Sequence, residues 1–249
     1  MFKGFYNLTS AMLTNQQHLN VVGNNMTNVS TAGYKQKQYT ATTFDEVMYS
    51  RLGNKDGKGP EIGKQSYIRA TSDITTDFRQ GSFEPTGIFL DFAINGEGFF
   101  AVADQNGAIS YTREGNFSLT EDGYLVLSGH GRVLDAQNNP IYMGTDKIAT
   151  DGYGGLYTQN GEYIGKLGVF TFENQDALAV NEQGMYQGAG AQAKPNAVVL
   201  NGYLERSNTD IVKQMTDMIS VQRSFQSAAQ VSKMYDQLMT KTTSDLGRL

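Results

Sequence analysis

The sequence predicts a mixed α and β fold, in which helices from both ends of the chain form one discontinuous coiled-coil domain beside an all-β middle domain. Three observations lead to this prediction. Apolar residues recur every three or four positions near the start of the chain, and they do so again near its end. All four prolines and 24 of the 28 glycines lie in residues 53–205. Because glycine and proline break helices, we expect helices at the ends and turns in the middle.

The first helix is expected from about Phe2 to Val29, with Gly33 as a left-handed cap. Its apolar residues alternate three and four positions apart, with Asn15 as the one interruption. This period keeps a narrow stripe facing a partner helix. The stripe consists of Phe5, Leu8, Met12, Leu19, Val22, Met26 and Val29. Four asparagines are either solvated or buried residues that set the register between packed helices, namely Asn15, Asn24, Asn25 and Asn28.

The last helix is expected to begin after a cap at Asn208 or at Thr209-Asp210, and to continue to about Ser244. Its apolar stripe keeps the same period, with Gln214, Ser232 and Thr242 in polar slots. A single helix cannot bury its own apolar stripe. The two terminal helices are therefore expected to pack against each other or against copies of themselves. The stripe consists of Ile211, Met218, Val221, Phe225, Ala228, Tyr235, Met239, Leu246 and Leu249.

The middle of the chain predicts β structure. In residues 81–205, short alternating segments are separated by Asn-Gly or Asp-Gly pairs, which is typical of hairpins. Strands are expected at 90–94, 99–102, 109–111, 116–119, 124–127, 141–143, 167–172 and 198–200, after which 202–205 leaves the sheet. Residues 34–80 lack a helical period and predict an extended connector, in which 44–48 could form a short helix. The expected domains are therefore 1–33 with 206–249 (helical), 34–80 (connector) and 81–205 (β-rich).

Charge and cysteine content exclude several classes of protein. Residues 1–44 carry three lysines and no acid, and residues 205–249 carry a net charge of +1, which leaves −9 for the middle of a chain whose net charge is −5. An acidic middle argues against nucleic acid as a partner. The absence of cysteine excludes disulfides and thiolate metal sites. We expect no membrane insertion and no cleaved signal peptide, because no apolar run is long enough for either.

The sequence offers little for catalysis, and we predict no catalytic residue, cofactor or metal site. His18 and His130 have no clustered partner in sequence, as a catalytic dyad or a metal site would need. The acid pairs Asp45-Glu46 and Glu121-Asp122 could indicate a glycoside hydrolase, but Gly123 makes the second pair a turn. The glycine-rich segments 152–155 and 188–190 lack the Lys-Ser/Thr of a phosphate loop.

Three blocks of sequence, in order along the chain, resemble the bacterial flagellar rod and hook family. Residues 19–35, LNVVGNNMTNVSTAGYK, resemble the N-terminal signature of that family. LDFAINGEGFF at 90–100, continued by YTREGNFSLTEDGYLV at 111–126, resembles its central motif. Gly202 to Asn208, GYLERSN, followed by the last helix, resembles its C-terminal block.

This resemblance implies a non-enzymatic axial subunit of the flagellar basal body. The family resemblance further implies export from the cytoplasm through the flagellar type III apparatus, helical stacking, and other axial proteins and copies of the same chain as partners. The length of 249 residues and the single middle domain disfavour the larger hook-type paralogue. The segment from Tyr39 to Gly81 differs from what the resemblance implies for a distal-rod paralogue, so a rod protein of proximal type is favoured. The expected assembly interface consists of the stripe residues Phe5, Leu8, Met12, Leu19, Val22, Asn25, Met26, Val29, Ile211, Met218, Val221, Phe225, Tyr235 and Leu246.

Two readings of other classes compete with this one. A secreted β-rich binding module or adhesin would explain the 14 tyrosines and 13 phenylalanines, but it would not explain heptads at both ends. A polysaccharide-active enzyme would explain the acidic middle, but no pair of acids is flanked by a convincing aromatic cleft. The concentration dependence of size separates the classes, because only an axial subunit is expected to polymerise.

Overall fold

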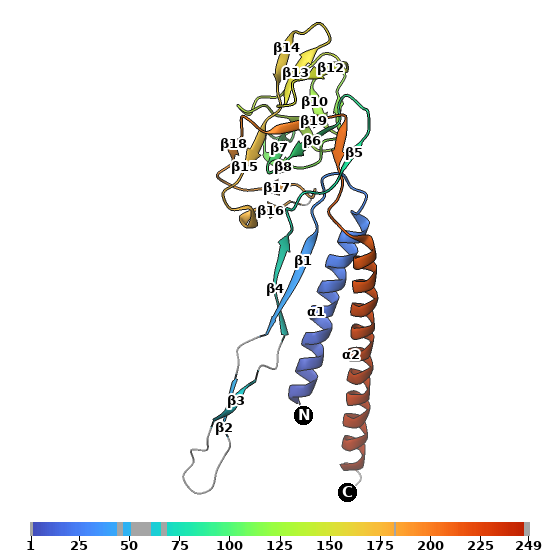
Figure 1. The fold of residues 1–249 in the computed structure, drawn as a ribbon. Helices are drawn as coiled ribbons and strands as arrows, with labels where there is room; N and C mark the ends of the chain where they lie inside the picture. The colour runs from blue at the N-terminus through green and yellow to red at the C-terminus, as the bar shows by residue number, and fades with distance from the viewer. Residues whose placement is uncertain (1, 44–46, 51–60, 66–68, 182, 247–249) are drawn as a thin grey trace. The chain divides into compact units, whose positions relative to one another are not determined.

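A computed structural model describes residues 2–43, 47–50, 61–65, 69–181 and 183–246 (Figure 1). The chain divides into two compact units. The helical unit contains Met1–Thr27, Lys37–Thr75 and Asp210–Leu249, and the β unit contains Asn28–Gln36 and Thr76–Thr209. Residues 37–75, most of the predicted connector, thus group with the two helices.

The helical unit is built on two antiparallel helices, α1 (Phe2–Thr27) and α2 (Ile211–Leu246). Asn15 Nδ2 donates to Ser224 Oγ over 3.0 Å, and Asn25 Nδ2 donates to Gln214 Oε1 over 3.2 Å. These pairs are ten residues apart on both helices and in opposite directions, which fixes the register. By this register Phe2 stands opposite residue 237, so the last turns of α2 extend beyond the start of α1 (Figure 1).

The start of α2 confirms one of the two predicted caps. Asp210 Oδ1 accepts hydrogen bonds from the backbone N–H groups of Val212 and Lys213, at 2.9 and 3.2 Å, which makes Asp210 the N-cap. Asn208 has a different role in the β unit, described below. The α1 helix ends at Thr27, so Gly33 lies beyond the helix and is not its cap, although its φ of +69° is left-handed as expected.

Four strands follow α1 along the chain. Strand β1 (Lys37–Thr43) pairs with β4 (Arg69–Thr76), and β2 (Val47–Ser50) pairs antiparallel with β3 (Glu61–Gln65). Val47 and Met48 are therefore in a strand, and the predicted short helix is wrong there, because cross-strand pairing outweighs a weak local helical pattern. Residues 44–46 of that prediction lie outside the described residues.

The β unit is built on antiparallel strands, as predicted. Its largest sheet among the described residues has the order β16-β17-β8-β7-β11-β10-β9, and β15 also pairs with β7 and with β18. These strands are β7 (Phe99–Ala103), β8 (Ile109–Thr112), β9 (Phe117–Leu119), β10 (Leu125–Leu127), β11 (Gly131–Val133), β15 (Val169–Thr171), β16 (Ala179–Val180), β17 (Tyr186–Gln187) and β18 (Gln192–Ala193).

Smaller sheets complete the β unit. One has the order β12-β13-β14, and two pairs are β19-β6 and β20-β5. These strands are β5 (Phe83–Pro85), β6 (Phe92–Asn95), β12 (Ile148–Thr150), β13 (Gly155–Thr158), β14 (Tyr163–Lys166), β19 (Val198–Asn201) and β20 (Tyr203–Glu205).

Two of the strand predictions need correction. Residues 203–205, expected to leave the sheet structure, instead form β20 and pair with β5. Residues 141–143 form no strand, and Tyr142 makes only an isolated bridge with Tyr124. Short segments of this kind carry too few apolar positions for the alternation of side chains to decide their pairing.

Two clusters of buried apolar side chains lie on opposite faces of β7. Phe100 and Val102 belong to the larger cluster with Phe92, Leu125 and Leu127, and Phe99 and Ala101 belong to the second cluster. Because side chains alternate along a strand, a strand with apolar residues at every position is buried on both faces. The second cluster is mainly aromatic and contains Tyr111, Phe170, Phe172 and Tyr186.

Candidate assembly interface

The residues of α2 that the sequence assigned to a stripe do lie on one face of the helix. From Lys213 to Tyr235, the buried or half-buried side chains are Gln214, Met218, Val221, Phe225, Ala228, Ser232 and Tyr235, together with only Asp217 and Ala229. This face packs along α1, and it follows the predicted 3.5-residue period including its polar slots. Ile211 at the start of the stripe stays exposed, and the side chain of Leu246 lies outside the described residues.

The corresponding residues of α1 face α2 to different degrees. Val22 and Asn25 are buried, Leu8, Met12, Leu19 and Met26 are half-buried, and Phe5 near the start is exposed. Val29 is half-buried and belongs to the β unit. The structure therefore brings the central stripe residues of both helices together and leaves the first residues of each stripe open to solvent.

Asn25 is a buried asparagine that ties three elements together. Its side chain donates to Gln214 and to the carbonyl of Lys37 at 2.8 Å, and its Oδ1 accepts from the N–H of Lys37 at 2.9 Å. A buried amide must find partners, and only one alignment of α1, α2 and β1 supplies them. Of the two interpretations of Asn25, the structure confirms the buried one. Asn24, in contrast, is exposed.

Sequence reasoning missed a second buried face of α1. Thr14 and Val21 are buried although they lie off the stripe. Beside them the His18 ring stacks on Tyr39 of β1, with ring centroids 4.9 Å apart. Burial lowers the pKa of His18, and the nearby Asp217 opposes this shift. The sequence did contain a signal for this second face, because Val21 and Val22 are adjacent apolar residues and a single narrow stripe accounts only for Val22.

The outer side of α2 carries apolar residues that no described element covers. Val212, Met215 and Ile219, which we call the first outer patch, are spaced three and four residues apart, and all are at least half exposed. Val231, Met234 and Leu238 repeat this spacing near the C-terminus. Exposed apolar residues on one side of a helix mark a surface that binds protein.

In the β unit, a buried ion triad joins the segments that lead to the two helices. Glu205 of β20 accepts from Lys35 Nζ at 2.6 Å and from Arg113 Nη1 at 3.2 Å, and the three side chains are 1 to 3% exposed. Burial lowers the pKa of both Lys35 and Arg113, and the Glu205 carboxylate counteracts the shift. The segment 28–36 and the segment around Glu205 are therefore fixed to one another by charge.

Asn208 and Gly33 hold the same crossing together. Asn208 accepts from the N–H of Gln36 at 2.7 Å and donates to the carbonyls of Asp77 and Arg79 at 2.8 and 3.0 Å. Gly33 donates its N–H to the carbonyl of Glu205 at 2.7 Å. A Cβ on Gly33 would lie 2.3 Å from the backbone carbon of Arg113, so the glycine permits this close approach.

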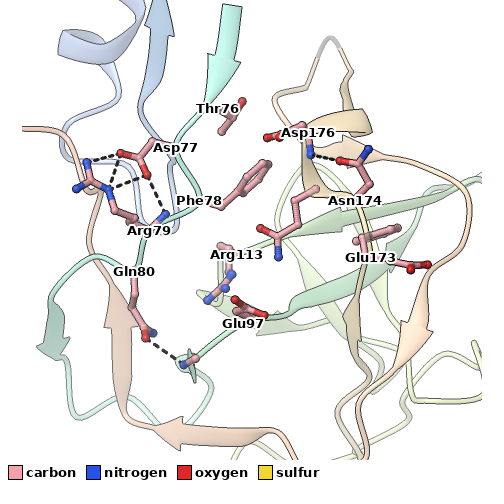
Figure 2. A pocket seen from close by; sticks show the side chains of 13 residues that line it. Thr76, Asp77, Phe78, Arg79, Gln80, Glu97, Arg113, Glu173, Asn174 and Asp176 are labelled. Carbon is pink, nitrogen blue, oxygen red and sulfur yellow. Dashed lines mark hydrogen bonds and ion pairs between the residues drawn. The ribbon is translucent and has the colours of Figure 1, made fainter.

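A cleft of about 660 Å³ opens in the β unit beside this triad (Figure 2). Its lining includes the acids Asp77, Glu97, Glu173 and Asp176. Asp77 is bound by Arg79, whose Nε lies 2.9 Å from Asp77 Oδ2, and these hydrogen bonds lower the pKa of Asp77. A general acid for glycoside hydrolysis needs a raised pKa, so this change is opposite to the one required.

Within the residues described, no cluster of three or more metal-ligating side chains occurs. Likewise, neither α1 nor α2, as far as each is described, is long and apolar enough to cross a membrane. The described residues offer packing surfaces on both helices. The main features are the helix pair, which leaves apolar residues of α2 exposed, and the buried ion triad that joins residues 28–36 to the segment around Glu205.

Comparison with known proteins agrees with these features. The family model described as "Flagella basal body rod protein" matches residues 5–35, that of the "Flagellar hook protein FlgE/F/G D1 domain" matches 93–188, and that of the "Flagellar basal body rod FlgEFG protein C-terminal" matches 200–245. The rod protein FlgG of Bacillus subtilis is 31% identical, over 96% of this chain and 97% of its own length. The chain belongs to the flagellar basal-body rod family. Rod proteins named FlgG in Buchnera aphidicola and FlgF in Caulobacter vibrioides are 29% and 28% identical over 91% and 96% of the chain.

Membership of the rod family assigns the function in general terms. The chain is a structural subunit of the flagellar basal-body rod, and other axial proteins of the flagellum are its partners. The three matched regions cover most of both helices and the centre of the β unit, so the resemblance noted in the sequence is confirmed.

Proposed function

We propose that the chain assembles helically into the rod, as part of the drive shaft between the membrane motor and the hook, and that α1 and α2 form its coiled-coil contacts with neighbouring copies. The observation that carries this proposal is the helix pair itself. Its inner seam is buried, while apolar residues on the outer side of α2 and at the start of α1 stay exposed. Contacts between different patches that do not close into a ring produce open helical assemblies.

The expected interface of the assembly is the set of stripe residues predicted from the sequence, extended by the first outer patch. Val22, Asn25 and Val221 hold the two helices of one copy together, and Phe5, Ile211 and the exposed patch are available to neighbours. Isolated helices owe most of their stability to packing, so the pair is expected to become fully ordered only in the assembled rod. Circular dichroism of the dilute monomer with both ends fully helical would contradict this part.

Export is proposed to occur through the flagellar type III apparatus. A chain without cysteine forms no disulfides, which suits a subunit that passes unfolded between redox compartments. Within the rod, a proximal position stays a prediction, since relatives named FlgG and FlgF match the chain to a similar degree. The composition of basal bodies purified from a deletion strain tests the position, because rod growth then stops just before the missing subunit.

The decisive test is the pair of variants Val22→Asp and Asn20→Asp on α1. Val22 is buried at the helix seam and Asn20 is exposed on the same helix, so both variants add one charge but only the first places it in an apolar contact. We expect Val22→Asp to abolish filament formation and motility while the β unit stays folded, and Asn20→Asp to behave as wild type. Normal assembly and swimming with Val22→Asp would contradict the proposal that assembly depends on this helix pair.

A further inference from the structure

The loop between β5 and β6 displays two large apolar side chains to solvent. Ile88 is 56% exposed and Phe89 is 52% exposed. The other large hydrophobic residues exposed in the described part of the β unit are two valines, each less than two fifths exposed, and tyrosines whose hydroxyl groups favour water. Adjacent aliphatic and aromatic side chains without a polar atom are costly to leave in water, which indicates a contact surface.

This loop is held in a fixed shape by hydrogen bonds rather than by a core of its own. The N–H groups of Thr86 and Gly87 donate to the carbonyl of Gly202 at 2.8 and 3.2 Å, and Asn201 Nδ2 donates to the carbonyl of Phe89 at 2.6 Å. Gly87 and Gly202 both have left-handed φ values, of +70° and +75°. A surface that is ordered before it binds loses little entropy on binding, as protein contact sites require.

The position of this loop along the chain suggests where its partner lies. Gly202, to which the loop is bonded, precedes the cap of α2 at Asp210 by eight residues, which span at most about 29 Å. In a helical array all copies have the same distance from the axis. Gly202, which anchors the loop, therefore lies within this distance, in radius, of Asp210, the cap of α2, in its neighbours. The first turns of α2, which follow this cap, carry the exposed first outer patch, Val212, Met215 and Ile219.

Charge favours a contact between the β unit of one copy and the helical unit of another. The residues of the β unit carry 16 acids and eight bases, whereas the helical unit carries a net charge of +3. Opposite net charges attract the two units at long range, and apolar residues then fix the contact at short range. A contact between two copies of the same kind of unit would lack this attraction.

We infer that Ile88 and Phe89 of one copy bind the first outer patch of α2 in a second copy. This inference rests on the proposed helical assembly and adds a contact between the β unit and a neighbouring helix to the contacts between helices. The partner that this loop binds is thus a second copy of the same chain. Charging the loop should raise the protein concentration needed for assembly about tenfold, the effect of losing roughly one well-buried apolar side chain.

The natural absence of cysteine allows a direct test by cross-linking. Two single variants of the full chain, Ile88→Cys and Met215→Cys, are mixed under assembly conditions and oxidised mildly. A disulfide within one molecule is impossible in this mixture, so a dimer containing one copy of each variant reports contact between copies. The matched control replaces Ile88→Cys with Gln105→Cys, which places the thiol on an exposed turn elsewhere in the β unit.

Each outcome of this test decides the inference. A mixed dimer with Ile88→Cys, at several times the yield obtained with Gln105→Cys, supports it. Equal yields, or none while the mixture still polymerises, would overturn the loop contact and leave the proposed assembly standing. If neither the mixture nor wild type polymerises at any concentration, the proposed assembly fails and this inference fails with it.

Discussion

The two units of this rod protein differ in how they bury apolar side chains. The β unit encloses two clusters with many fully buried residues, among them Phe92, Phe100 and Leu125. In the described part of the helical unit, only Val21, Val22 and Val221 are buried apolar residues. Since burial of apolar surface is the main stabilising term in folding, the β unit can be stable alone. We expect the helical unit to need further surface from other copies.

The largest expected effect concerns the ion triad of the β unit. Glu205→Gln removes the carboxylate between Lys35 and Arg113, so that each buried cation loses the carboxylate to which it is hydrogen-bonded. Losing one partner of a buried ion pair costs about 3–5 kcal/mol of unfolding free energy. Urea unfolding of the β unit, followed by tyrosine fluorescence, measures this loss.

The control for this prediction is Glu84→Gln, which removes one partner of an exposed ion pair. Glu84 and Arg206 are more than half exposed and 3.5 Å apart. Solvent screens such a pair, so its loss should cost less than about 1 kcal/mol. Equal losses in both variants would mean that the triad does not stabilise the crossing of the two segments.

A smaller loss is expected for Gly33→Ala in the β unit. Alanine at this position would have to adopt a left-handed φ. Its Cβ would also lie 2.3 Å from the backbone carbonyl carbon of Arg113, which is a collision. The conformation alone costs about 1–2 kcal/mol, and the collision adds to it. Gly129→Ala is the matched control, because Gly129 also has a left-handed φ but no atom lies within 4 Å of its added Cβ. Thermal unfolding should show the larger decrease for Gly33→Ala.

In the helical unit, the expected change has the opposite sign. Gly23 lies inside α1, and a Cβ there would meet no atom within 4 Å. Gly23→Ala should therefore stabilise the helix by about 1 kcal/mol through propensity alone. The helical content of the dilute monomer should rise. An unchanged or lower helical content would show that the helical content of the monomer is not set by the intrinsic stability of α1.

The smallest effect concerns pH. Burial lowers the pKa of His18 below its ordinary value of 6.5, so the folded helical unit binds this proton less readily than the unfolded chain does. Stability of the helix pair is then lost as pH falls below 6.5 towards the lowered pKa, and Asp217 limits the loss. The variant His18→Gln should remove this part of the pH dependence. Helical content of both proteins between about pH 7.5 and 5 measures it.

Elements in which the apolar period holds over many residues were predicted well from the sequence, and the contacts between elements were predicted less well. Both helices, the α2 seam and the Asp210 cap follow from periodicity and capping, which depend on neighbours in sequence. The stacking of His18 on Tyr39 depends on β1 lying beside α1, and the triad depends on residues 35, 113 and 205, which lie far apart in sequence. Such long-range pairs leave no periodic signal. Lys35 and Glu205 fell within the recognised motifs, but their pairing was not predicted.

The central claim is that the β unit is stable alone and that the helical unit becomes stable on assembly. Hydrogen–deuterium exchange, compared residue by residue between the dilute monomer and the assembled filament, tests it most directly. We expect protection of β7 and β10 in both states, and protection of α1 and α2 that is weak in the monomer and strong in the filament. Helices protected in the dilute monomer as strongly as β7 would contradict the claim.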